Sequence, residues 1–300
     1  MQQPEPYHHC PLELTPDIWL LGNYFINLYL VRGRRASALF EMGVSAVVDD
    51  VIGQLEGLDI APDYLVLAHP HTDHLSGLPG LLQRYPGARL VAGEGARDFV
   101  RHPKALPGMI SEDRHIAKRL GEVGLPAGRA SLQTLPFPED HHIIRKTQDI
   151  DLGGVTLRCI PVEGHAPGNL VAHVPEKEAL LVSDSLGFHY PGRGFCPLFF
   201  TGYDPFMETL TELAALEPEL VGPGHQGAVT GPTAAAVFER AREAADEVLG
   251  IVGAGTGEDA IIAEQLFEKF YVDEFTLYSP ENIMGCCRLL VRRAREVIEK

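Results

Sequence analysis

A short histidine-rich run most strongly constrains what this chain can fold into. His69, His71, Asp73 and His74 directly follow an apolar segment, residues 64–67, that predicts a buried strand. Alternation along the loop would turn His69 and His71 to one side and Asp73 and His74 toward another. Imidazole and carboxylate groups spaced in this way are typical of metal ligands. We therefore expect a metal site after this strand, with room for two neighbouring ions.

The composition indicates a globular protein that binds a small molecule. The chain has 300 residues, of which 45% are hydrophobic, enough to bury a large core. It carries 25 Lys and Arg against 41 Asp and Glu, a formal charge of −16. Such a surface repels nucleic acid backbones and anionic membranes. We therefore expect a small-molecule substrate, with neither nucleic acid nor membrane as a partner.

The cysteine content and the N-terminal segment predict a cytoplasmic location. Five cysteines occur without CxxC spacing, which favours reduced and mostly buried thiols. The N-terminal stretch lacks an apolar core of signal-peptide length, and no later run reaches the about 20 apolar residues that span a bilayer. We expect a cytoplasmic protein, and the sequence leaves open whether it forms a homodimer.

Hydrophobic patterning divides the chain into two parts. Residues 1–232 combine short apolar runs with helical stretches and Gly/Pro turns, which predicts a mixed α/β domain. Residues 233–300 have few turn signals and predict a C-terminal helical region docked on that domain. The expected strands include residues 26–31, 64–67, 89–91, 155–160, 170–174 and 180–183, and the expected C-terminal helices are 234–252, 258–271 and 281–300.

Three further metal-competent side chains follow predicted strands. His165 lies in a Gly/Pro-rich turn, Asp184 ends an apolar run, and His225 is flanked by glycines. Taken alone, either histidine is more often a surface or capping residue than a ligand, and Asp184 could cap a helix. Together with the run that begins at His69, however, they form a set for which a purely structural explanation is weak.

This set of residues resembles the metallo-β-lactamase superfamily, whose hallmark is an HxHxDH motif followed at intervals by His, Asp and His. The resemblance extends over residues 17–231. It implies an αββα sandwich with the site at one edge, between two sheets. Carried over position by position, it implies a first ion held by His69, His71 and His165, a second held by Asp73, His74 and His225, and Asp184 bridging both.

The resemblance also implies a cofactor and a mechanism. Imidazole and carboxylate ligands without thiolate suit two Zn²⁺ ions, although Fe or Mn would accept the same ligands. Water bridging two dications loses a proton near neutral pH, and the resulting hydroxide attacks a polarised carbonyl or phosphoryl group. Asp73 could also carry a proton to the leaving group. We therefore expect a dinuclear metallohydrolase.

The sequence lacks features of several known branches of the superfamily, and we therefore expect the substrate to be a small ester, thioester or lactone. The ligand substitutions of true β-lactamases are missing, and so are the basic surface of the superfamily's nucleases and an evident glutathione site. Two other function classes stay open. One is an iron-dependent oxidoreductase, either similar to persulfide dioxygenases or with a di-iron centre. The other is a metal-binding sensor of a small molecule.

An aromatic segment, residues 188–203, follows Asp184 and is expected to be irregular. It could wall a substrate pocket for an acyl or aryl group, with Arg193 as an anchor for a carboxylate. Equally, its rings could pack the segment onto the domain or form a dimer interface. The candidate pocket residues are Phe188, His189, Tyr190, Arg193, Phe195, Phe199, Phe200 and Tyr203.

Overall fold

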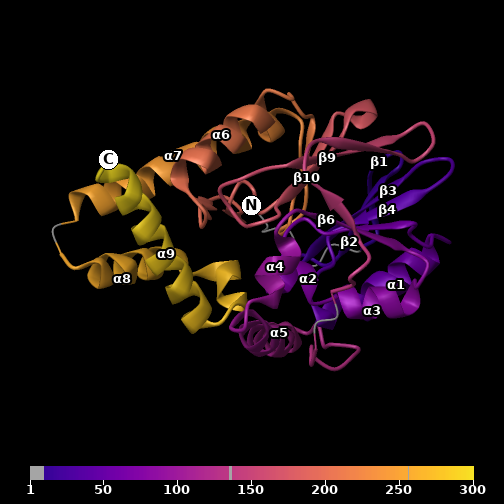
Figure 1. The fold of residues 1–300 in the computed structure, drawn as a ribbon, viewed down its shortest axis with the longest axis horizontal. Coiled ribbons are helices and arrows are strands. Elements are labelled where there is room, and N and C mark those ends of the chain that lie inside the picture. Colours follow the sequence, from indigo (N-terminus) through magenta and orange to yellow (C-terminus); the bar gives the residue numbers. More distant parts are fainter. Residues whose placement is uncertain (1–9, 135–136, 256) are drawn as a thin grey trace.

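Two β-sheets lie face to face in the computed structural model, which describes residues 10–134, 137–255 and 257–300. Helices cover both outer faces, and the C-terminal helices α8 and α9 extend to one side (Figure 1). The expected αββα sandwich with a C-terminal helical appendage is therefore confirmed.

The first sheet has seven strands in the order β1 to β7. Its first four strands pair antiparallel, whereas β4, β5, β6 and β7 run parallel. The strands are β1 (Leu12–Thr15), β2 (Ile18–Gly22), β3 (Asn27–Arg32), β4 (Ser37–Phe40), β5 (Tyr64–Val66), β6 (Arg89–Gly93) and β7 (His142–Ile144). The α-helices in this half are α1 (Val48–Gly57), α2 (Thr72–Leu75), α3 (Leu78–Arg84), α4 (Ala96–Arg101) and α5 (Ala105–Glu122).

The second sheet has six strands in the order β15-β14-β11-β10-β9-β8, and its strand β11 pairs parallel with β14. A separate hairpin, β12–β13, follows β11. The strands are β8 (Gln148–Asp151), β9 (Thr156–Pro161), β10 (Leu170–Val174), β11 (Ala179–Ser183), β12 (Phe188–Tyr190), β13 (Gly194–Cys196), β14 (Leu220–Pro223) and β15 (Val229–Thr230). The α-helices in this half are α6 (Tyr203–Ala214), α7 (Pro232–Ala254), α8 (Asp259–Phe270) and α9 (Pro280–Ile298), with a 3₁₀ helix, η3 (Asp273–Leu277), before α9.

Alternation along the strands builds two hydrophobic layers. In β3, Tyr29 and Val31 belong to the core between the sheets, while Leu28 and Leu30 belong to the core beneath the helices. All of β10 and β11 is buried, as expected for strands covered on both faces. This packing fixes the register of each sheet, because a one-residue slip would exchange the two faces.

The predicted secondary structure agrees with the observed elements in most places. Strands β3, β5, β6, β9, β10 and β11 and helices α7, α8 and α9 lie where the patterning predicts them, within a few residues. The expectation of an irregular segment over residues 188–203 was wrong for its first part, which the β12–β13 hairpin occupies. The division into 1–232 and 233–300 stays a prediction. No helix in the described part of the chain is long and apolar enough to cross a membrane.

Candidate metal centre

The seven predicted ligands meet at one edge of the sandwich because each follows a strand end. His69 and His71 lie in the loop after β5, and α2 carries Asp73 and His74. His165, Asp184 and His225 follow β9, β11 and β14 respectively. Gly224 allows the close approach of these segments, since a Cβ there would lie 2.6 Å from His74 Cε1 and 3.0 Å from Asp184 Oδ1.

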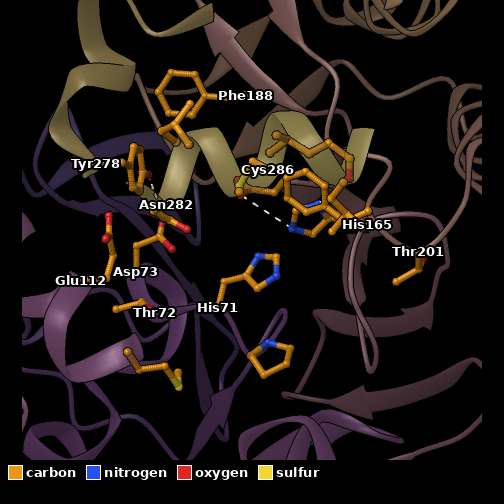
Figure 2. A pocket seen from close by; sticks show the side chains of 18 of the residues that line it. His71, Thr72, Asp73, Glu112, His165, Phe188, Thr201, Tyr278, Asn282 and Cys286 are labelled. Atoms are coloured by element: carbon orange, nitrogen blue, oxygen red, sulfur yellow. Dashed lines mark hydrogen bonds and ion pairs between the residues drawn. The ribbon is translucent and has the colours of Figure 1, made fainter. Parts of the chain in front are cut away.

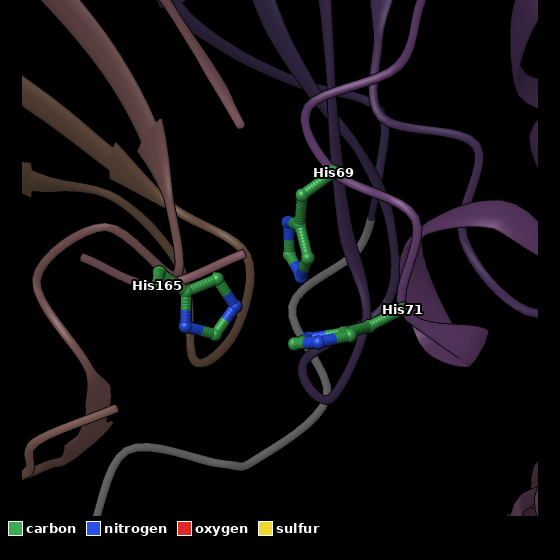
Figure 3. Close-up of side chains that lie close together, drawn as sticks. All are labelled: His69, His71 and His165. Carbon is green, nitrogen blue, oxygen red and sulfur yellow. The ribbon is translucent and has the colours of Figure 1, made fainter. Parts of the chain in front are cut away.

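One group consists of three imidazoles, those of His69, His71 and His165 (Figure 3). Their ring centroids lie 4.5 to 4.7 Å apart, and one ligand atom from each lies within 4.8 Å of the others. His69 and His165 are buried, and His71 is half-buried. We call these three residues the first group.

A second group contains Asp73, His74 and His225, all buried. Asp73 Oδ2 lies 3.2 Å from His74 Nε2 and 3.4 Å from His225 Nε2.

Asp184 lies between the two groups. Its Oδ2 is 3.9 Å from His69 Nε2 and 3.8 Å from His165 Nε2, and 3.3 Å from His74 Nε2. Its Oδ1 is 3.3 Å from His225 Nε2. One carboxylate thus borders imidazoles of both groups, which is the arrangement that a ligand shared by two ions requires.

Contacts on the far side of the rings orient these imidazoles. His165 Nδ1 lies 2.9 Å from Leu198 O, and His225 Nδ1 lies 2.6 Å from Phe25 O. Ser183 Oγ lies 3.2 Å from His69 Nδ1 and 3.4 Å from His74 Nδ1. With Nδ1 held in this way, Nε2 is left to face the centre, the usual arrangement of metal-ligating histidines.

Unpartnered buried atoms indicate that the site fits metal ions. The Nε2 atoms of His69, His74 and His165 and the Oδ1 atom of Asp184 are buried without a hydrogen-bond partner. Buried polar groups are nearly always satisfied, so unpartnered atoms gathered at one point are typical of a site that holds a ligand. Nitrogen and oxygen donors suit Zn²⁺, and they also suit Fe or Mn.

Burial and charge give the two groups different protonation behaviour. Burial, and then neighbouring imidazoles, lower the pKa of His69 well below its usual value and that of His71 to about 3, and burial also lowers the pKa of His165. Burial acts in the same direction on His74 and His225, but nearby carboxylates outweigh it. The pKa of His74 is raised chiefly by Asp73, and the pKa of His225 is raised chiefly by Asp184. The first group therefore consists of neutral imidazoles, the form that binds a metal.

Sequence reasoning missed two buried neighbours of the second group. Glu41, directly after β4, has a carboxylate oxygen 3.0 Å from His74 Nδ1. Tyr278, between η3 and α9, donates a hydrogen bond from its hydroxyl to Asp73 Oδ2 over 2.7 Å and lies 3.3 Å from His225 Nε2. The C-terminal helical region therefore contributes a side chain to the centre. No spacing rule in the sequence connects Tyr278 to a motif 205 residues earlier.

A cavity of about 560 Å³ opens onto the centre. His71, Asp73, His165, Asp184 and Tyr278 line its inner part. Figure 2 shows Tyr278, Asn282 and Cys286 on one side of it and His71 and Thr72 on the other. Helix α5 contributes Ala105, Met109 and Glu112 and so forms part of the rim of this cavity.

The predicted substrate pocket requires correction. Phe188 and Phe200 line the cavity, and both lie close to ligands: the Phe188 ring is 5.2 Å from that of His225, and the Phe200 ring is 5.5 Å from that of His165. The other six candidates are not among the described residues that line it; they are His189, Tyr190, Arg193, Phe195, Phe199 and Tyr203.

Those six side chains have other partners. Tyr190 donates a hydrogen bond to Phe270 O over 2.6 Å, and Arg193 pairs with Asp273 at 2.6 Å; both border a separate groove. The rings of His189 and Phe195 lie 4.9 Å apart, and those of Phe199 and Tyr203 lie 5.5 Å apart. Phe195, Phe199 and Tyr203 also belong to the main hydrophobic core, so the expectation that such rings pack the segment onto the domain holds for most of it.

An αββα sandwich with histidine and carboxylate side chains gathered at its strand ends defines a class of metal-binding α/β proteins. The model of the metallo-beta-lactamase superfamily matches residues 21–225, and the chain belongs to this superfamily.

The relatives of this chain have different names. A metallo-beta-lactamase fold-containing protein of Sulfurisphaera tokodaii, ST1585, is 28% identical over 207 residues, which is 68% of this chain and 73% of that protein. A hydroxyacylglutathione hydrolase of Acidiphilium cryptum is 31% identical over 228 residues, 71% of this chain and 75% of the relative. A solved beta-lactamase domain protein of Burkholderia ambifaria superposes with a TM-score of 0.69 at 16% identity, over 95% of this chain and 88% of that one. This last likeness shows the fold alone.

Proposed function

We propose that this protein is a metal-dependent hydrolase that holds two divalent ions, Zn²⁺ first among them, and acts on a small ester, thioester or lactone. The observation that carries the proposal is the position of Asp184, within 3.3 to 3.9 Å of imidazole nitrogens from both groups. The unpartnered Nε2 atoms of His69, His74 and His165 supply further donors beside it. When bound, two such ions supply Lewis-acid chemistry that acidifies water and polarises a carbonyl group.

The chain's own residues divide the remaining work. His69, His71 and His165 would hold one ion, Asp73, His74 and His225 the other, and Asp184 both. Asp73 lines the cavity and accepts a hydrogen bond from Tyr278, so its carboxylate is held where it could pass a proton to a leaving group. Phe188 and Phe200 present apolar surface beside the ligands, which favours a carbon-rich substrate and displaces water.

Elemental analysis of the protein purified without added metal tests this proposal together with a substrate panel. The panel contains simple esters, lactones, a phosphodiester and, because relatives are named hydroxyacylglutathione hydrolases, a hydroxyacylglutathione thioester. We expect about two Zn per chain and hydrolysis of at least one ester, thioester or lactone, both lost on chelation and regained on reloading.

Two results would contradict the proposal. One Fe per chain with oxygen uptake on persulfides would replace hydrolysis with iron-dependent oxidation. A fully metal-loaded protein that hydrolyses nothing in the panel would favour a sensor of a small molecule.

A further inference from the structure

Helix α9 has two functional faces. Its buried residues Cys287, Leu290 and Val291 belong to the hydrophobic core, and α7 and α8 contact this helix. Another set of residues borders the cavity above the candidate metal centre; it consists of Glu281, Asn282, Ile283, Gly285, Cys286, Leu289, Arg292 and Arg293. Because α9 follows Tyr278 directly, the same segment contacts the second group and walls the space in front of it.

The middle of this face is left empty by its sequence. Gly285 lies inside α9, where glycine costs roughly 1 kcal/mol relative to alanine. A Cβ at Gly285 would meet no atom within 4 Å, so no neighbouring group requires glycine there. Gly285 is exposed, so this open space continues into solvent, and Gly285 lines the cavity together with Cys286.

The cavity that Gly285 lines also reaches the candidate metal centre. His165, a candidate ligand that is 1% exposed, lines the same cavity. The walls of the cavity are largely apolar and include Phe188, Phe200 and Leu289. A volume of about 560 Å³ is in the range of small-ligand sites, so the cavity can take more than the reacting group alone.

Charged residues limit the apolar part of the α9 face at both ends. Glu281 lies at its start, and Arg292 and Arg293 lie at its far end, where Arg293 donates a hydrogen bond to Phe200 O over 2.9 Å. The rise of an α-helix separates Asn282 from Arg292 by about 15 Å along the axis. The small and apolar residues Gly285, Cys286 and Leu289 fall between these ends.

We propose that Gly285 determines the size of the acyl group that this site accepts, and that the substrate is an ester or thioester whose straight apolar acyl chain lies over Gly285 and Cys286. This inference rests on the proposed hydrolase function and adds the substrate class to it. A short acyl group would leave the space over Gly285 unfilled, whereas a chain such as hexanoyl would bury its methylene groups there.

The variant Gly285→Leu tests this assignment, because it fills the space without touching a candidate ligand. Its matched control is Gly250→Leu in α7, an exposed helical glycine where a Cβ also meets nothing within 4 Å. With metal-loaded protein, we expect Gly285→Leu to lower the ratio of kcat/KM for a hexanoyl thioester to that for the acetyl thioester by about 10-fold or more. Gly250→Leu should leave the ratio unchanged.

A binding measurement makes the test independent of turnover. Isothermal titration calorimetry with hexanoate should show affinity for the metal-loaded wild type and for Gly250→Leu, and a loss of about 10-fold or more in Gly285→Leu. Metal content and thermal unfolding of each variant establish that the centre and the fold are intact.

The outcomes separate the two proposals. If the wild type hydrolyses no ester or thioester but binds hexanoate in a way that Gly285→Leu weakens, the acyl site stands and the hydrolase function fails. If the wild type hydrolyses acyl thioesters and Gly285→Leu changes neither the chain-length ratio nor hexanoate binding, the hydrolase function stands and the role of Gly285 is overturned.

Discussion

The two ligand groups of the candidate centre differ in their chemistry and in the parts of the chain that contact them. The first group consists of imidazoles alone, and its residues all come from the α/β part of the chain. The second group combines imidazoles with a carboxylate, borders Glu41, and accepts a hydrogen bond from Tyr278 in the C-terminal helical region. The first group thus depends on burial to keep its ligands neutral, whereas the second depends on charge and on a distant segment. The C-terminal helices therefore belong to the site as well as to the fold.

The largest effect should come from the residue that joins the two groups. Asp184→Ala removes the carboxylate that lies within 3.9 Å of imidazole nitrogens of both groups. Without this negative charge, two bound dications would repel each other more strongly. We expect metal content to fall from about two ions per chain toward none. The loss of activity should exceed the about 100-fold upper range seen for outer-sphere substitutions. Elemental analysis after gel filtration measures the metal content, and initial rates on the best substrate of the panel measure the activity. Retention of two ions would disprove the bridging role.

A substitution at Tyr278 should have a smaller effect, limited to the ion held by the second group. Tyr278→Phe removes the hydroxyl that donates to Asp73 but keeps the ring that packs near Phe188 and Phe275. Because outer-sphere partners tune ligands, we expect about 10-fold weaker binding of the second ion and unchanged binding of the first. Competition with a chromophoric chelator resolves the two constants. Tyr190→Phe is the control, since its hydroxyl bonds to Phe270 O, away from the centre. Equal weakening of both ions would contradict the division into two groups.

The positions of the seven candidate ligands could largely be predicted from local sequence. The run from His69 to His74 sits in one loop after one strand, and strand ends gather at a sheet edge, so the ligands follow from pattern and topology together. Tyr278 could not be predicted, because its contact with Asp73 depends on how the C-terminal region packs across 205 residues of sequence.

The aromatic segment illustrates the other limit of sequence reasoning. Its aromatic composition is typical of a pocket wall, but the β12–β13 hairpin turns neighbouring rings, such as those of Phe188 and His189, to opposite sides. Phe188 faces His225, whereas His189 on the opposite side of the strand packs with Phe195. Composition could therefore identify the segment but not select Phe188 from its neighbours.

The smallest effect should be a difference in pH dependence between the two groups in metal-free protein. Burial and neighbouring imidazoles hold the pKa of His71 at about 3, below the 6.5 of an unfolded chain. The unfolded state therefore binds the proton first, and stability is lost as the pH falls below 6.5. The pKa of His225 is raised, chiefly by Asp184 acting against burial, so its contribution is present below pH 6.5 and is lost as the pH rises through the raised value.

Substituting one histidine of each group should accordingly change the slope in opposite directions. In urea unfolding of chelator-treated protein, His71→Gln should reduce the loss of unfolding free energy between pH 6.5 and 5. A fully shielded group with this pKa would account for about 2 kcal/mol of unfolding free energy between pH 6.5 and 5. We expect about 1 kcal/mol, because His71 is half-buried beside the cavity and water screens its charge. His225→Gln should make the loss larger, since it removes a group that stabilises the fold at the acid end. Slopes that change in the same direction would mean that charge and burial act alike on both groups, and the contrast between them would fail.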